Sequence, residues 1–334
     1  MANYDNIKLE KGLYSGGNFT AALESIDRDE NYKGTALEDL DAYQRQLKRY
    51  GIKVSGPQSD SIAKFFSTAD SSVLFPEFVS RAVRQGMAEN DMLSSIVATT
   101  TSIDSNDYRS ISSDLSDDDK ELKIVGEGAF IPETSIKVKG NLVSLKKRGR
   151  SLVASYEAIK YQKLDLFAVT LKQIGAYISR SLFADAITVL RNGDGNLNAA
   201  TVVNSASAGT LAYSDLVSLW TGFDPYKMNT VIAAPNMTGA ILNMSQFRDT
   251  AAGLDTHASG KLVTPFGAQL INTSAMQSGY LIGMDKNASL EMIKAGDIMT
   301  EYDKFIDRQL DRAVISCTVG FAKMFTGASK VLKI

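Results

Sequence analysis

The side chains best suited to catalysis are scarce in this sequence. Its 334 residues include one histidine, His257, and one cysteine, Cys317. His257 lies among small polar residues, where a histidine is usually a solvated surface group rather than a general base. Cys317 lies in an apolar run, where a cysteine acts as a small buried hydrophobe and not as a nucleophile. One residue of each kind also excludes an internal disulfide and a zinc site of cysteines and histidines.

Three polar segments have residue types that bind ions or phosphates, and each has a simpler explanation. Residues 192–195 (Asn-Gly-Asp-Gly) are similar to part of a calcium loop, but Val203 stands where an EF-hand has its last glutamate. A turn that ends a helix is therefore favoured there. The aspartates at 117–119 fit a solvated loop, or a salt-bridge partner on another subunit. Gly126-Glu127-Gly128 lacks the Lys-Ser/Thr of a phosphate-binding loop. We expect no cofactor, no metal and no enzymatic activity, with a carboxylate-held divalent metal as the enzymatic alternative.

Composition sets further bounds on the class of protein. The hydrophobic fraction of 44% is enough for a sizeable core, and the net charge of −2 gives no overall attraction to nucleic acid. The basic segment 146–148 has no interleaved aromatic residues for stacking on bases. No apolar run is long enough to span a membrane, and no secretion signal is visible at the N-terminus. The sequence predicts a globular protein that folds in a reducing cytoplasm and contacts DNA only non-specifically.

The first part of the chain differs in character from the rest. Residues 1–66 are polar with mixed charges, and their apolar spacing predicts one helix from Thr35 to about Tyr50. Residues 51–61 are typical of a linker. Two interpretations remain open: a flexible arm with one docking helix, or a small domain that folds by itself.

The next two segments predict a helix and then a long hairpin. In residues 67–100, Pro76 fits the first turn of a helix with an apolar stripe. Residues 101–150 have no helical periodicity, and the alternation around Val138 predicts a strand with one apolar face. An acidic cluster precedes this strand and a basic one follows it. We therefore expect residues 101–150, the extended loop, to be a two-stranded arm with opposite charges at its two ends.

An arm of this kind needs a surface outside its own subunit. An isolated hairpin is only marginally stable in water, because it cannot bury its apolar face by itself. We expect it to lie on a neighbouring copy of the chain, with complementary charges fixing the register. The charged residues predicted at such contacts are Asp117, Asp118, Asp119, Glu127, Lys137, Lys139, Lys146, Lys147 and Arg148.

The remainder of the chain predicts a mixture of helices and strands, and so an α+β fold. The strongest helical signal runs from residue 155 to residue 192, with Leu164 to Val189 at helical spacing. Further helices are expected at 215–223 and 236–247. The strands expected are a buried one at 231–234, short ones between 281 and 302, and an apolar core strand at 313–325.

The order of these features resembles the major capsid proteins of tailed bacteriophages with the Hong Kong 97 (HK97) fold. Residues 125–136 (V-G-E-G-A-F-I-P-E-T-S-I) are similar to the E-G-x-x-x-P-x-S/T stretch of that family's extended loop, the E-loop. Residues 152–157 and the helix at 164–190 stand where the family has a turn and a long spine helix. Residues 192–195 resemble the turn after the spine, and residues 231–236 resemble the start of the axial domain.

The resemblance covers about residues 72–334 and implies an HK97-like capsid fold. The implied parts are an N-terminal arm or scaffold-like segment (1–66), the N-arm and first helix of the peripheral domain (67–100), the extended β-hairpin loop (101–150), the peripheral domain with its spine helix (151–214), the axial domain (215–300) and return strands of the peripheral domain (301–334). Residues 1–66 are shorter than the scaffolding segment that some members cleave. The lysine, asparagine and glutamate that some members use for self-crosslinking are not assigned to positions of this sequence, so the resemblance does not extend to that chemistry.

For function, the resemblance implies self-assembly into pentamers and hexamers of an icosahedral shell around double-stranded phage DNA. Implied partners are other copies of the chain, the portal, scaffolding and decoration proteins, and packaged DNA. The implied location is the virion, after assembly in the cytoplasm of a host bacterium. The alternative is the shell of an encapsulin nanocompartment, which encloses a cargo enzyme. The separate N-terminal segment favours the phage interpretation.

Overall fold

The structure, a computed structural model, describes residues 4–10, 13, 19–105, 107–112, 122–131, 133, 137–155, 161–248, 266–305 and 310–334. They form an α+β fold of two compact units, each assembled from separate stretches of the chain. Unit 1 comprises Met1–Asp91, Lys147–Ser179 and Asp297–Thr318, and unit 2 comprises Met92–Lys146, Arg180–Gly296 and Val319–Ile334. Among the described helices, none combines the length and apolar character needed to cross a membrane.

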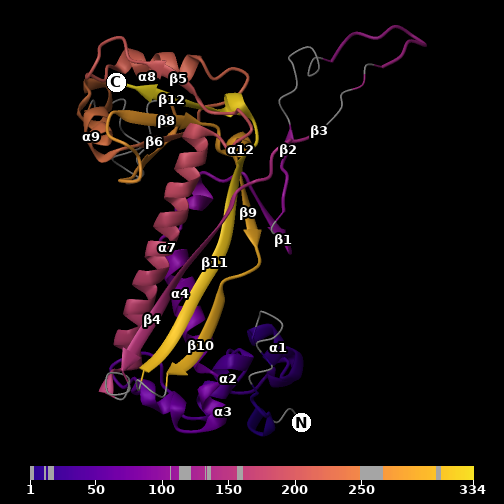
Figure 1. The fold of residues 1–334 in the computed structure, drawn as a ribbon, viewed down its shortest axis with the longest axis vertical. Helices are drawn as coiled ribbons and strands as arrows, with labels where there is room; N and C mark the ends of the chain where they lie inside the picture. The colour runs from indigo at the N-terminus through magenta and orange to yellow at the C-terminus, as the bar shows by residue number, and fades with distance from the viewer. Residues whose placement is uncertain are drawn as a thin grey trace. The chain divides into compact units, whose positions relative to one another are not determined.

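Unit 1 begins with short helices and continues into longer elements (Figure 1). Its 3-10 helices are η1 (Tyr4–Asn6), η3 (Asp29–Tyr32) and η4 (Ile62–Phe66). Its α-helices are α1 (Phe19–Ile26), α2 (Ala42–Arg49), α3 (Ala69–Ser72), α4 (Phe75–Glu89) and the first half of α7 (Leu164–Asn192). Its strands are β10 (Met299–Phe305), most of β4 (Leu145–Ser155) and the first part of β11 (Leu310–Lys323).

Helix α2 is shorter than the helix predicted from Thr35 to about Tyr50. The carboxylate of Asp41 accepts a 2.8 Å hydrogen bond from the Gln44 backbone N–H, and the Gln44 side chain accepts one of 3.0 Å from the Asp41 N–H. This capping box satisfies donors at the helix start and fixes it at Ala42. Residues 33–39 form turns and bends instead. Leu37 and Leu40, which contribute to the apolar spacing that predicts a longer helix, are half-buried within and just after those turns.

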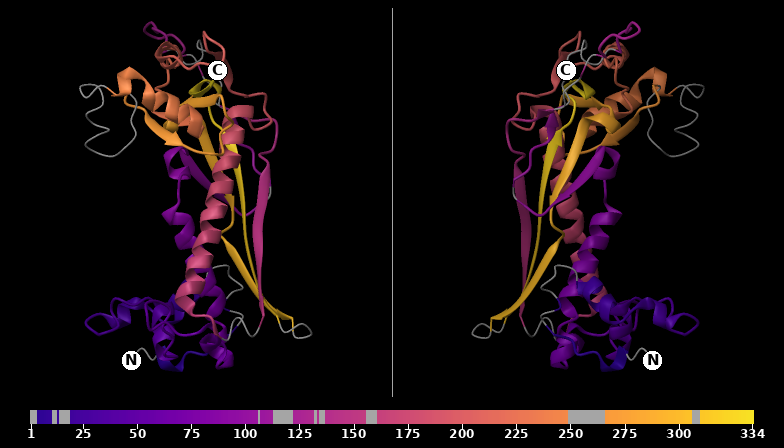
Figure 2. Two further views of the ribbon diagram at one scale, coloured as in Figure 1. Left: turned by 90° about the vertical axis from the view of Figure 1, so that its left-hand side faces the viewer. Right: turned by 90° about the vertical axis from the view of Figure 1, so that its right-hand side faces the viewer.

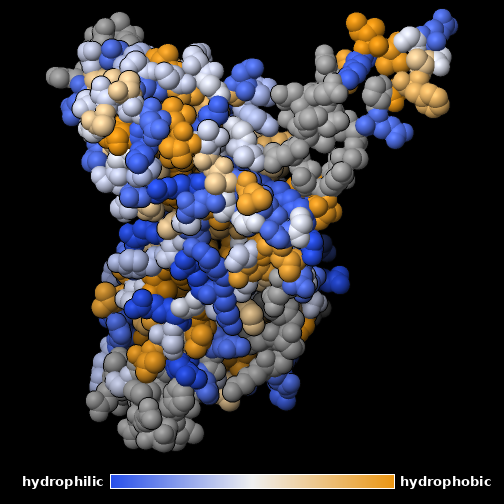
Figure 3. Space-filling view, turned by 45° about the horizontal axis from the view of Figure 1, so that its top comes forward, coloured by the Kyte–Doolittle hydropathy of each residue, from blue (hydrophilic) through white to orange (hydrophobic). Residues whose placement is uncertain are grey.

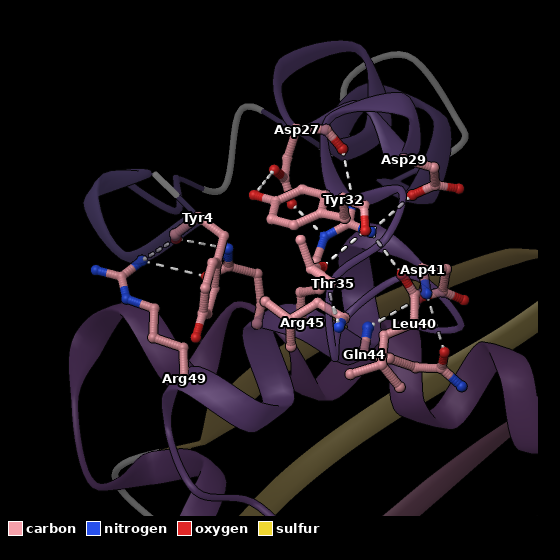
Figure 4. Close-up of polar contacts among 12 residues, drawn as sticks. Tyr4, Asp27, Asp29, Tyr32, Thr35, Leu40, Asp41, Gln44, Arg45 and Arg49 are labelled. Carbon is pink, nitrogen blue, oxygen red and sulfur yellow. Dashed lines mark hydrogen bonds and ion pairs between the residues drawn. The ribbon is translucent and has the colours of Figure 1, made fainter. Parts of the chain in front are cut away.

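A fully buried arginine holds the N-terminal segment together (Figure 4). Arg45 is 0% exposed, and its Nε donates to Asp27 Oδ2 over 2.7 Å. A second ion pair joins Arg45 to Asp29 at 2.8 Å, and the guanidinium lies 4.1 Å from the ring centroid of Tyr32. The Tyr32 hydroxyl donates to the other oxygen of Asp27. A buried charge is tolerated only where it is paired and hydrogen-bonded in this way, so the segment is packed rather than a flexible arm.

The same segment packs on α4 within unit 1. Thr20 donates a 2.7 Å hydrogen bond to the buried carboxylate of Glu77 on α4. From α4, Arg81 forms a 2.6 Å ion pair with Asp41, and Tyr43 of α2 donates to the carbonyl of Leu74. These contacts make the segment part of one compact unit with α4. No boundary between units falls at residue 66, because residues 1–91 lie in one unit.

The buried tyrosine of this cluster predicts a pH effect. Burial, together with the hydrogen bond to Asp27, raises the pKa of Tyr32 to about 12. Because this pKa lies above the value of about 10 in an unfolded chain, the neutral phenol stabilises the fold below about pH 10. That contribution is lost as the pH rises from about 10 through 12. We expect Tyr32→Phe to reduce the alkaline loss of stability in thermal melts over this pH range. Tyr161→Phe, at a side chain 76% exposed, is the matched control. An equal alkaline loss in Tyr32→Phe and wild type would contradict this account.

Helices α4 and α7 lie side by side in unit 1 (Figure 2). A Cβ at Gly86 of α4 would collide with the backbone of Lys172, and one at Gly175 of α7 would collide with the backbone of Val83. The two glycines therefore allow a close approach of the two helices. The start predicted at Pro76 is confirmed to within one residue. The long helix is also confirmed, but it begins later than predicted, because residue 155 still belongs to β4.

One mixed sheet has the order β1-β9-β11-β10, with β4 also paired to β11. In unit 2, β1 (Thr99–Ile103) runs parallel to β9 (Leu290–Ala295), and the last residues of β11 run antiparallel to β9. In unit 1, β10 pairs antiparallel with the first part of β11. The two ends of the extended loop therefore enter this sheet separately. The predicted two-stranded arm is present where residues 111–112 pair with residues 137–138, but it does not extend across all of 101–150, because β1 pairs with β9 and β4 pairs with β11.

Unit 2 holds a second sheet of order β5-β12-β8-β6-β7. Its strands are β5 (Thr201–Asn204), β6 (Thr230–Ala233), β7 (Gln269–Asn272), β8 (Tyr280–Met284) and β12 (Ser329–Lys333). The helices of unit 2 are the second half of α7, η5 (Leu93–Ser95), α8 (Tyr213–Thr221), α9 (Pro235–Asn243), α10 (Ser245–Arg248), α12 (Lys286–Ser289) and η7 (Thr326–Ala328). Strand β6 is buried along its whole length, as its apolar run predicts. The helix predicted at 215–223 and the short strands after 281 are confirmed, the helix predicted at 236–247 is divided into α9 and α10, and the core strand predicted at 313–325 ends at Lys323.

Candidate intersubunit surfaces

The described part of the extended loop has two legs that pair over a short distance. Strand β2 (Ile111–Ser112) runs antiparallel to β3 (Lys137–Val138), with Ile111 opposite Val138. Toward the base, the Lys139 N–H donates to the carbonyl of Ser110, and the Val143 N–H donates to that of Tyr108. The two legs therefore leave unit 2 as one paired ribbon.

A buried carboxylate of β9 fixes the first leg. Glu291 is 7% exposed and accepts hydrogen bonds from three hydroxyl groups. Thr101 and Tyr108 each donate over 2.6 Å, and Ser110 donates over 2.8 Å. Burial, followed by the hydrogen bond to Glu291, raises the pKa of the Tyr108 phenol. Because hydrogen bonds to a buried charged group are strong, this clamp holds residues 101–110 firmly against the sheet.

A second buried carboxylate, Asp194, fixes the other leg. Lys139 donates to Asp194 over 3.3 Å, and their side chains are 6% and 1% exposed. The ammonium of Lys139 also donates to the Lys323 carbonyl. Two residues further on, Asn141 donates to Asn196 Oδ1 over 3.0 Å and to the Gly195 carbonyl over 2.7 Å. The turn that ends α7 is thus the support on which the second leg lies.

The same contacts lower the pKa of Asp194. Burial alone would raise the pKa of Asp194, but hydrogen bonds from the Asn196 side chain and the Lys323 backbone N–H, with the charge of Lys139, hold it below its usual value. Asp194 therefore stabilises the fold above a pH of about 4, and this contribution is lost as the pH falls through its lowered pKa.

We expect Asp194→Asn to destabilise the subunit by about 3 kcal/mol at pH 7, because it leaves the Lys139 ammonium buried without its counter-ion. Urea unfolding at pH 7 measures this difference. The difference in stability between variant and wild type should become smaller in melts at a pH below about 4, where the wild type loses the contribution of the Asp194 charge. Asp297→Asn, at an exposed position, is the matched control. A gap of equal size at both pH values would contradict the clamp.

Beyond the ribbon, the extended loop carries large apolar side chains in full contact with solvent. Leu122 is 97% exposed, Ile124 103%, Phe130 100% and Ile131 77%. Figure 1 draws this segment apart from the other elements of unit 2, and Figure 3 shows hydrophobic side chains gathered on it. Apolar side chains this exposed and this close in sequence mark a surface for a partner. We call residues 122–131 the loop tip.

The charged residues predicted at intersubunit contacts have different positions in the structure. Lys139 is buried and paired within its own chain, so its place among the intersubunit residues is corrected. Lys146 pairs with Asp185 over 2.9 Å but stays 51% exposed. Glu127 lies in an exposed turn of the loop tip and Lys147 is exposed on β4. Arg148 is half-buried on β4, Lys137 begins β3, and Asp117, Asp118 and Asp119 lie outside the described residues.

The other candidates for chemistry do not form a site within the described residues. Those residues contain no group of three or more His, Cys, Asp or Glu side chains placed to hold a metal ion. Cys317 is buried in β11 as predicted, and burial raises the pKa of its thiol. His257 lies outside the described residues. The Asn-Gly-Asp-Gly stretch is a turn, with Gly193 at φ +83° and Gly195 at φ +94°.

The fold is similar to those of solved capsid structures. The capsid of a native GTA particle has 14% sequence identity and a TM-score of 0.55, over 75% of this chain and 90% of that one. A virus-like particle from Pyrococcus furiosus has 12% identity and a TM-score of 0.52, over 77% and 98% of the two chains. The structure of Microbacterium phage Oxtober96 has 9% sequence identity and a TM-score of 0.51, over 73% of this chain and 91% of that one. The fold is therefore the HK97-like capsid fold that the ordered motifs predict.

The sequence itself matches a capsid family. A profile of the family described as phage capsid protein matches residues 140–315, which is more than half of the chain. The chain therefore belongs to the phage capsid protein family. It is a shell protein that assembles with further copies of itself, and its place is the capsid of the virion. None of the curated proteins compared with the chain matches it.

Proposed function

We propose that this chain is the major capsid protein of a tailed phage. Its copies assemble as pentamers and hexamers, and these close into an icosahedral shell around double-stranded phage DNA. The observation that carries this proposal is the loop tip. Four large apolar side chains at 77–103% exposure stand on a loop whose two legs are clamped by buried carboxylates. Exposed apolar side chains on a loop that is fixed at its base are expected to be buried against another subunit.

The neighbouring copy of this chain is the proposed partner of the loop tip. Charged groups around the loop would fix the register by complementarity: Glu127 at the tip, Lys147 and Arg148 on β4, and the acidic run at 117–119. Many such contacts, each weak, let misplaced subunits leave during assembly and still give a stable closed shell. No chemical step is assigned to the chain, so its proposed role is structural and not enzymatic.

The remaining partners follow from the same role. Filling a shell through a portal does not require a subunit that attracts DNA, and the net charge of −2 fits this. We propose a portal protein and a scaffolding protein as assembly partners, a decoration protein as an optional one, and non-specific contact with the packaged DNA. The proposed place of assembly is the cytoplasm of the host bacterium.

The test is the behaviour of the chain when it is produced alone. Sedimentation velocity and negative-stain electron microscopy of the purified protein should show rings of five or six subunits, or closed shells, above a threshold concentration. Monomers at every concentration tested, including in the presence of crowding agents, would contradict the proposal. Particles from infected cells that contain an enzyme in place of DNA would favour the encapsulin alternative instead.

A further inference from the structure

Leu197 is a fully exposed leucine in a strained backbone conformation. Its side chain is 104% exposed, and its φ of +58° lies in the left-handed region. Among the described residues it is the only one other than glycine with a positive φ. Bulky side chains rarely adopt this conformation because the Cβ approaches the following carbonyl oxygen. Glycine or asparagine would fit the same turn without strain and without exposing apolar surface.

The turn that carries Leu197 is held rigidly, which keeps the strain in place. The Asp194 N–H donates to Asn198 Oδ1 over 3.0 Å, and the Asn196 N–H donates to Asp194 Oδ1 over 3.2 Å. Asn198 is only 4% exposed, and Asp194 is clamped from the other side by Lys139. Ending α7 requires only the glycines of this turn, and supporting the loop requires only Asp194 and Asn196. Neither role uses the leucine, and strain of this kind persists where surrounding contacts maintain it for a function.

A second exposed leucine follows a residue that is hydrogen-bonded to this turn. Asn141 makes two hydrogen bonds to the turn, at Asn196 and Gly195, and the residue that follows Asn141 and the residue that follows Asn196 are both leucines. These two residues are Leu142 and Leu197, and Leu142 is 45% exposed. We call Leu142 and Leu197 the leucine pair. It lies at the base of the extended loop, so it is continuous with the leg whose tip is proposed to lie on a neighbouring copy.

We infer that the leucine pair is an anchor that inserts into an apolar recess of a neighbouring copy of this chain in the assembled shell. The inference rests on the proposed function and names a contact at the base of the loop, separate from the loop tip. A second copy is favoured because the chain forms a shell, in which each subunit is surrounded by other copies. DNA is not a fitting partner, because leucine offers nothing to a phosphate backbone. Two aliphatic side chains bury far less than the roughly 1,000 Å² of a stable contact, so the pair is expected to be covered only within the shell.

Substitution of Leu197 by glycine separates assembly from folding. Leu197→Gly removes the anchor and also relieves the strained φ, so the subunit should melt at the wild-type temperature or above it. Its threshold concentration for shell assembly, measured by light scattering, should rise about tenfold, the effect of losing one buried leucine contact. Leu197→Met has the same backbone conformation and an apolar side chain, and should assemble at a threshold within about twofold of wild type. Assembly of Leu197→Gly at the wild-type threshold would overturn the inference.

A position-specific crosslink identifies the partner. Cys317 is buried, so Leu197→Cys presents one accessible thiol among the described residues, and a maleimide-benzophenone can be attached to it. Illumination of shells should give a covalent dimer of this chain, and illumination of dispersed subunits should give none. Shells without the dimer, or with a crosslink only to a different protein, would overturn the inference while leaving the proposed function intact. A wild-type chain that forms no shells would overturn both.

Discussion

A chain in which residues 113–136 are replaced by an Asn-Gly turn is expected to fold and to fail completely in closing shells. Ser112 and Lys137 are directly opposed in the β2–β3 ladder, so a two-residue turn can join them without disturbing either clamp. Lys139, Val143 and Ser110 all remain, and these are the buried residues of the loop base. The replacement removes the loop tip, which makes no contribution to the core of its own subunit. A deletion from 110 to 145 would be a poorer test, because it would remove those buried groups as well.

Two measurements separate folding from assembly in this variant. Its melting temperature should lie within a few degrees of wild type, while electron microscopy should show no closed shells at any concentration. A milder companion keeps the loop and replaces Leu122, Ile124, Phe130 and Ile131 by serine. This companion isolates the apolar contact from loop length, and it should assemble much less well than wild type. Shells of normal size from the loop replacement would show that the loop tip is not the contact that closes the particle.

Arg45→Met is expected to be the most destabilising single substitution in the N-terminal segment. It leaves Asp27, a carboxylate that is 2% exposed, without the guanidinium that neutralises it. Removing one partner of a buried ion pair typically costs about 3–5 kcal/mol, and this loss should lower the melting temperature by about 10 °C. Because the segment packs on α4, the loss should spread to the rest of unit 1. Particles should form poorly from the variant for this reason, not through loss of a contact between subunits.

A double-mutant cycle makes the Arg45 prediction specific. Asp27→Asn combined with Arg45→Met removes both charges, so the double variant should be less destabilised than the sum of the two single variants. Arg28→Met, at an exposed position on the same segment, is the matched control and should melt as wild type. A change of less than about 2 °C in Arg45→Met would show that residues 1–66 are a dispensable arm.

The elements that could be predicted from the sequence are those whose own periodicity decides their structure. The apolar spacing from Leu164 to Val189 is long enough to specify α7, and the glycines at 193 and 195 specify its end. The apolar runs of β6 and β11 specify buried strands in the same way. In these segments, local pattern and tertiary burial favour the same result.

Residues whose role depends on distant partners could not be predicted. Thr101 and Glu291 are 190 residues apart in sequence, and no local pattern indicates that β1 runs beside β9. Lys139 alternates with apolar residues, which is typical of a solvent-facing lysine. Only the fold shows that it is buried and paired with Asp194, 55 residues later. Nothing in the sequence around Glu291 indicates that it fixes one leg of the loop. For Asp194 the sequence predicts only a place in a turn.

A cryo-electron-microscopy reconstruction of the particles that this chain assembles into most directly tests whether one copy closes the shell by packing its extended loop on the next. We predict a closed icosahedral particle in which Leu122, Ile124, Phe130 and Ile131 of each copy lie against a neighbouring copy, with the two clamps at the loop base intact. Closed particles in which these four side chains remain in solvent, or lie against their own subunit, would contradict the central claim.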